Sequence, residues 1–102
     1  MTATERRVLI GRANYLARHA RKLYREAAEA EEAELSSFHT TESLGASVVN
    51  VVQLWREAWD LDRAATVAYR WLRPPTMIPE DAVRQLQQFC EEHKLWPWWG
   101  RL

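Results

Sequence analysis

The sequence predicts an all-α fold in which a long antiparallel helical hairpin precedes a third helix and a Trp-rich C-terminal tail. The 102 residues include only three Gly and four Pro, which is too few for the many turns of an all-β chain. Apolar residues recur at alternating intervals of three and four along two long segments. Hydrophobic residues make up 47% of the chain. We therefore expect residues 1–102 to form a single helical-bundle domain.

The first helix is expected over residues 4–35. Thr4 can cap its start, and Glu5 in the first turn favours the positive end of the helix dipole. Small and large apolar residues alternate along one face with the heptad spacing of a helix that packs against another helix. We call this face the Leu/Ala seam and expect it to pack against the second helix. Its members are Leu9, Ala13, Leu16, Ala20, Leu23, Ala27 and Ala30.

The second helix is expected over residues 42–73, after a Ser/Thr-rich loop that competes with helical hydrogen bonding. Its apolar face carries one charge, Asp62. Either the helix is continuous and Asp62 pairs with an arginine of the first helix, or Asp60-Leu61-Asp62 marks a break with an acidic cap; the unbroken apolar spacing favours the continuous helix. The expected face is Leu44, Val48, Val51, Trp55, Ala58, Asp62, Ala65, Tyr69 and Leu72, and the core is also expected to take in Trp59 and Trp71.

The third helix is expected over residues 79–94. Pro74-Pro75 forms a rigid connector, and Pro79 suits the first helical position. Pro97 ends the helix and leaves a tail with Trp96, Trp98, Trp99 and Arg101. This tail either folds back onto the hairpin or inserts into a partner, because Trp and Arg are frequent binding anchors.

Charge is sorted along the first helix although the whole chain is neutral. Residues 1–25 carry seven bases and one acid, whereas residues 26–42 carry six acids and no base. Five of the bases fall opposite the seam and form a stripe. This stripe is either a surface that matches a phosphate backbone or an ordinary solvated helix face, and the near absence of acids among residues 6–25 favours the phosphate-binding surface. This Arg stripe consists of Arg7, Arg18, Arg21, Lys22 and Arg25.

The same sorting favours self-association. Two copies laid antiparallel along the first helix would match each basic half with an acidic half. Glu29 and Glu32 would then belong to a partner-binding surface, together with the tryptophan tail.

Residue patterns for catalysis or cofactor binding are missing from the sequence. Cys90 and His93 are three residues apart on one helix face, and two ligands do not complete a site. The chain has no Gly-rich phosphate loop and no Gly-x-Ser-x-Gly turn. We therefore expect no enzyme activity, cofactor, metal or small-molecule substrate.

Compartment and function follow from these exclusions. No apolar run reaches the ~18–20 residues of a membrane span, and a single cysteine forms no intrachain disulfide, so a cytoplasmic location is expected. The sequence favours a non-catalytic small helical subunit of a larger assembly, in particular a nucleoprotein complex. In it the Arg stripe contacts nucleic-acid backbone and the Trp-rich tail docks protein. The alternative is a protein–protein interaction module, either a homo-oligomeric assembly factor or a partner-binding inhibitor.

Overall fold

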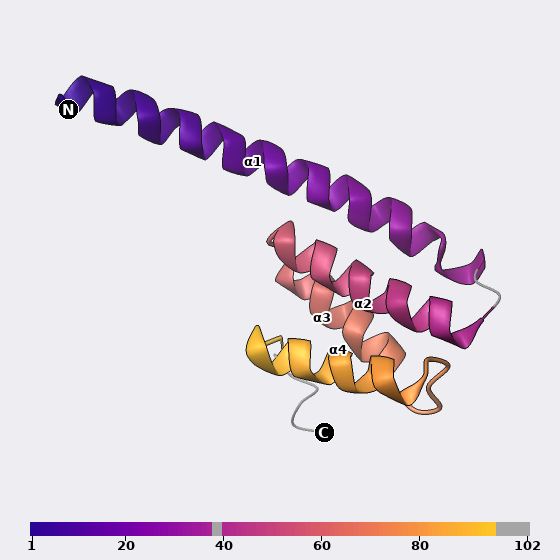
Figure 1. Ribbon diagram of the computed structural model, residues 1–102. Helices are drawn as coiled ribbons and strands as arrows, with labels where there is room; N and C mark the ends of the chain where they lie inside the picture. Colours follow the sequence, from indigo (N-terminus) through magenta and orange to yellow (C-terminus); the bar gives the residue numbers. More distant parts are fainter. Residues whose placement is uncertain (38–39, 96–102) are drawn as a thin grey trace.

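The computed structural model confirms the all-α fold and describes residues 1–37 and 40–95 (Figure 1). Four α-helices and one short 3₁₀ turn make up the regular structure of these residues. In chain order they are α1 (Ala3–Ala33), η1 (Leu35–Ser37), α2 (Thr41–Glu57), α3 (Leu61–Leu72) and α4 (Glu80–Glu92).

Helix α1 is the longest element, with 31 residues. Its N-cap is Thr2, two residues before the expected N-cap Thr4, because Thr2 forms a capping box with Glu5. The Thr2 hydroxyl accepts a hydrogen bond from the Glu5 backbone N–H at 3.1 Å, and the Glu5 carboxylate accepts one from the Thr2 N–H at 3.3 Å. The chain then turns through η1 into α2, which runs antiparallel to α1 (Figure 1).

The prediction of one continuous second helix is wrong, because the helix ends after α2 and a separate helix, α3, follows. Trp59 adopts a positive φ of 61°. The Asp60 N–H bonds back to the Trp55 carbonyl at 3.0 Å, which is the helix-ending pattern that glycine usually adopts. Asp60 then caps α3, since its Oδ1 accepts from the Arg63 N–H at 3.1 Å. The alternative of a break with an acidic cap is the observed one.

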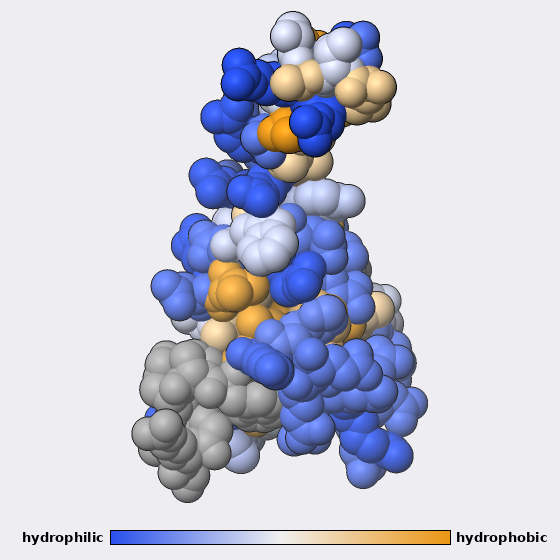
Figure 2. Space-filling view, turned by 90° about the vertical axis from the view of Figure 1, so that its left-hand side faces the viewer, coloured by the Kyte–Doolittle hydropathy of each residue, from blue (hydrophilic) through white to orange (hydrophobic). Residues whose placement is uncertain are grey.

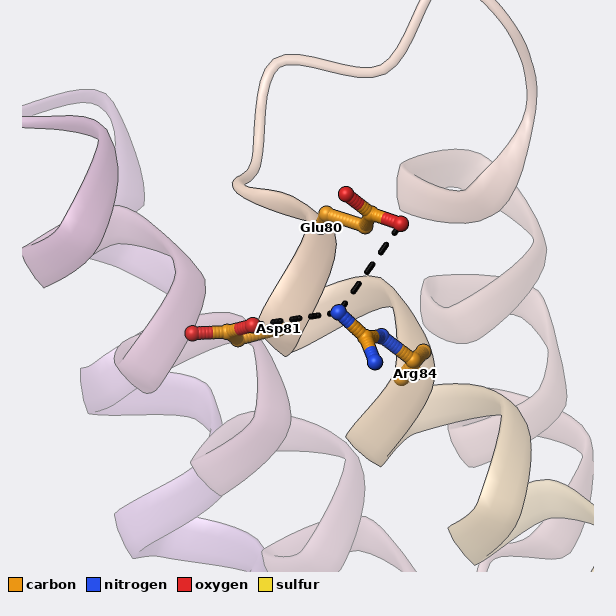
Figure 3. Close-up of polar contacts among 3 residues, drawn as sticks. All are labelled: Glu80, Asp81 and Arg84. Atoms are coloured by element: carbon orange, nitrogen blue, oxygen red, sulfur yellow. Dashed lines mark ion pairs between the residues drawn. The ribbon is translucent and has the colours of Figure 1, made fainter.

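Helices α3 and α4 complete the body against α2. The contact between α2 and α4 is close at Gly45, where a Cβ atom would lie 2.8 Å from Ala82 Cβ and 2.8 Å from Pro79 Cδ. Pro79 is the N-cap of α4 rather than its first helical residue. At this exposed end Arg84 lies 3.8 Å from Glu80 and 3.5 Å from Asp81, and both pairs are within α4 (Figure 3). Exposed pairs of this kind add little to stability.

The core lies among α2, α3, α4 and the C-terminal half of α1. Trp55 is its largest fully buried side chain, and Leu86 and Leu95 close the side formed by α4. Trp71 is half-buried, whereas Trp59 is exposed at the corner between α2 and α3, so the expectation that Trp59 belongs to the core is wrong. Among the described residues, no helix is both long enough and apolar enough to cross a bilayer.

A candidate protein interface on the projecting helix

The N-terminal half of α1 projects beyond the body (Figure 1). Helix α1 has 31 residues and α2 has 17, so α1 outruns its neighbour by about 20 Å at 1.5 Å per residue. Residues 1–19 are all exposed. The body ends near Arg21, whose guanidinium carbon lies 5.2 Å from the ring centroid of Trp59. About half of α1 therefore presents all its faces to solvent.

Helix α1 contacts the body through a face that the sequence did not indicate. Ala28 has no exposed surface, and Leu35 in η1 is also buried. Glu32 Oε1 accepts a hydrogen bond from Trp55 Nε1 at 2.8 Å, which satisfies the indole of the largest core residue. Together with Arg21, these residues define a body face that follows the spacing 21, 28, 32 and 35.

The expectation that the Leu/Ala seam packs against the second helix is wrong. Successive residues of an α-helix are turned by about 100°, so Ala27 and Ala28 point in directions a quarter-turn apart. The body uses Ala28, whereas Ala27 and Ala30 are exposed. The exposed fractions of Leu9, Leu16 and Leu23 are 48%, 57% and 51%. Ala20 is the only half-buried member of the seam.

The exposed apolar surface of α1 extends beyond the seam. Figure 2 shows hydrophobic and hydrophilic groups side by side on the projecting end of the helix, at the top of the view. Val8, Ile10 and Tyr15 are each at least as exposed as the seam leucines. Exposed apolar residues that gather on one helix mark interaction sites more often than scattered apolar residues do. The projecting helix is therefore the strongest candidate for a functional surface among the described residues.

The structure divides the Arg stripe into two parts. Arg7, Arg18, Lys22 and Arg25 are exposed, and no ion pair joins them to an acid in the described ranges. They lie on the side of α1 opposite the seam, as their helical spacing requires. Arg21 instead turns toward the body and lies over Trp59. A shallow depression lined by Asn14, Ala17, Arg18 and Arg21 lies beside this contact.

The two glutamates assigned to partner binding also differ. Glu29 is exposed, and so is Glu26 one turn before it. Glu32 is half-buried and its carboxylate accepts the Trp55 indole N–H, so this residue holds α1 on the body. Trp96, Trp98, Trp99 and Arg101 lie outside the described residues.

Sequence reasoning missed the role of Trp59, which joins the projecting helix to the body. Arg21 of α1 and Arg56 of α2 both place a guanidinium carbon over its ring, at 5.2 Å and 5.5 Å from the centroid. Cation–π contacts at exposed sites contribute about 0.5–1 kcal/mol each. The one available signal was Asp60-Leu61-Asp62, which indicated a break but did not indicate which residue would turn the corner.

Cys90 and His93 lie in different surroundings at the C-terminal end of α4. Cys90 is fully buried, and burial raises the pKa of its thiol from 9.0 to about 11, with a smaller contribution from the charge of Glu91. The ring of His93 packs against Phe89, with the centroids 4.3 Å apart. Within residues 1–37 and 40–95, no three side chains of His, Cys, Asp or Glu form a group that could hold a metal ion.

Comparison with protein families, with curated proteins and with solved structures finds no match to this chain. The geometry of α1 is therefore the basis for a functional conclusion.

Proposed function

We propose that this protein is a non-catalytic helical subunit that assembles with protein through the Leu/Ala seam of α1. The observation that carries the proposal is the exposure of Leu9, Leu16 and Leu23 on a helix that projects from the body. The sequence favours a subunit of a nucleoprotein complex, with a protein–protein interaction module as the alternative. The exposed seam favours the protein–protein interaction module.

The energetics support this choice. Fully burying a leucine side chain contributes roughly 1.5–3 kcal/mol relative to leaving it in water. The three leucines of the seam are about half exposed in the isolated chain. Burying the rest of their surface against a partner would therefore contribute several kcal/mol of binding free energy. An apolar stripe at heptad spacing is the surface that a second helix covers best, because its side chains interdigitate with those of the partner.

Site-specific photo-cross-linking tests the proposal. A photoreactive phenylalanine analogue replaces Leu16 in one sample and Gln87, an exposed residue of α4, in the control. Both proteins are irradiated in a cell extract of the source organism. We expect a discrete adduct from position 16, its loss when Leu9 and Leu23 are also changed to Glu, and no adduct from position 87. Equal yields from the two positions, or none from position 16, would contradict the proposal.

A second function, contact with nucleic-acid backbone, is favoured by a separate observation. Arg7, Arg18, Lys22 and Arg25 are exposed, carry no ion pair among the described residues and lie opposite the seam. A partner helix on the seam would leave this stripe open, so the two functions are compatible. Such binding would be insensitive to base sequence and strongly salt-dependent.

A salt series with generic single- and double-stranded nucleic acid tests this second function. Arg18 and Arg25 are changed to Glu, and the control changes the exposed Arg70 and Arg73 of the body in the same way. We expect the stripe variant to lose about tenfold in affinity at low salt and to show a salt slope smaller by about 2, because each phosphate contact adds about 1. If the unmodified chain does not bind nucleic acid at low salt, or if both variants lose affinity equally, the Arg stripe is not the nucleic-acid-binding surface.

A further inference from the structure

We propose that the occupant of the Leu/Ala seam is a second copy of this chain, laid antiparallel along α1 about a two-fold axis near Arg18. This inference rests on the proposed function, because it takes the seam as the docking surface. It adds the identity of the partner, the direction of the two helices and their register.

Residue sizes along the seam select the antiparallel direction. In a parallel pair each leucine would face a leucine and each alanine an alanine, so wide and narrow layers would alternate. In an antiparallel pair centred near residue 18, every layer between residues 9 and 27 instead places one leucine against one alanine, which keeps the two helices at one separation there. The layers are Leu9 with Ala27, Ala13 with Leu23, and Leu16 with Ala20 of the second copy.

Neighbouring registers are less favourable. A shift of one heptad in one direction places the charged Arg6 opposite Leu23 inside the apolar layers. A shift in the other direction leaves Leu9 opposite Glu34. The register centred near Arg18 places all three leucines opposite alanines and leaves Arg6 opposite Ala30, at the ends of the seam.

Charge complementarity supports the same register. Residues 26–34 of one copy, with five glutamates, lie along residues 2–10 of the other, which carry Arg6 and Arg7 against Glu5. Four of the remaining bases, Arg18, Arg21, Lys22 and Arg25, lie opposite the seam and so point away from the second copy. At the flank of the seam Arg12 faces Glu26 of the second copy, which lies two positions beyond Tyr24, the residue directly opposite Arg12. Both residues are exposed and neither has an ion pair in the described part of the chain. The pair occurs twice by symmetry.

The body does not obstruct this arrangement. The body face of α1, marked by Ala28 and Glu32, points away from the seam, because at 100° per residue Ala28 is turned about 140° and Glu32 about 180° from Leu23. A two-fold axis near Arg18 therefore places the two bodies end to end, on opposite outer sides of the helix pair. Each projecting half then lies beside the covered half of the other α1, while Arg7, Arg18 and Arg25 remain on the outer edges.

Light scattering over a concentration series provides the first measurement. We expect a particle of twice the 12.0 kDa chain mass. Leu16→Glu should raise the dissociation constant at least ~100-fold, since the change occurs twice at the interface. Tyr15→Glu introduces the same charge one residue away, off the seam, and should leave the constant within about threefold. A monomer at every concentration and ionic strength, or equal effects of the two changes, would overturn the inference.

A charge swap tests direction and register. Arg12→Glu and Glu26→Arg should each weaken the dimer about tenfold, and the double variant should restore it, because the two groups then pair with inverted sign. In a parallel pair Arg12 would face Ala17 instead, and the double variant would restore nothing. A spin label at Val8 in Cys90→Ala protein gives an independent readout. The antiparallel register separates the two labels by about 30 Å along the axis, whereas a parallel pair places them about 10 Å apart.

The cross-linking experiment separates failure of this inference from failure of the proposed function. A position-16 adduct of twice the chain mass supports both. An adduct with a different protein, together with a monomeric purified chain, overturns the second-copy inference and leaves the proposed function standing. No adduct from position 16 overturns both.

Discussion

The register of α1 on the body can be tested by substituting two neighbouring alanines. Ala28 has no exposed surface, so a leucine there must fit three additional carbon atoms between α1 and α2. Overpacking of this kind costs about 1–3 kcal/mol, either as strain or through partial separation of α1 from the body. Ala27 is exposed on the seam, so Ala27→Leu should change the free energy of unfolding by less than about 0.5 kcal/mol.

Thermal and urea denaturation followed by circular dichroism measure the difference. Both substitutions are made in the Leu16→Glu background, so that self-association does not contribute. For a domain of this size a loss of 1 kcal/mol lowers Tm by about 4–8 °C, so Ala28→Leu should lower it by roughly 5–20 °C. Ala27→Leu should leave Tm nearly unchanged. A loss with Ala27→Leu equal to or larger than that with Ala28→Leu would refute the assignment of the body face.

Two further predictions concern packing and pH. Gly11→Ala should raise the free energy of unfolding by up to ~1 kcal/mol, because nothing lies within 4 Å of the added Cβ. Gly45→Ala should lower it by about 1–2 kcal/mol, because the added Cβ would contact Pro79 and Ala82. Urea denaturation measures both changes. Because the folded pKa of Cys90 is raised to about 11, its contribution to stability should be present below pH 9 and fall by about 3 kcal/mol between pH 9 and 11. The difference in unfolding free energy between wild type and Cys90→Ala isolates this effect, and a difference that is independent of pH would contradict it.

Much of the helical architecture could be predicted because its causes are local. The Ser/Thr-rich stretch that ends α1 and the proline connector before α4 act within a few residues, and both appear where expected. The break after α2 was harder to predict, because the usual glycine is replaced by Trp59. The apolar spacing also runs through the break from Trp55 to Ala65, since α2 and α3 both turn their apolar faces toward the same core.

The exposure of the seam in the folded chain could not be predicted, because periodicity shows that a face is apolar and does not show what covers it. Contact between α1 and the body depends on one small residue, Ala28, and on polar groups such as Glu32 and Arg21. These side chains look like solvent-facing residues in a sequence. Their partners, Trp55 and Trp59, are recognisable only once the helices are placed in space.

The heptad spacing of the seam therefore requires an explanation outside the folded monomer. Residues 9–30 include seven charged side chains, and all of them avoid the seven seam positions. Packing within the chain does not account for this, because the body touches a different face of the helix. A solvated face needs no such exclusion, since charged residues are favoured there. A helix that packs against another helix does need it, because each layer would otherwise bury a charge without a partner. The pattern that does not describe the contact between α1 and α2 thus supports our proposal that α1 packs against a second molecule.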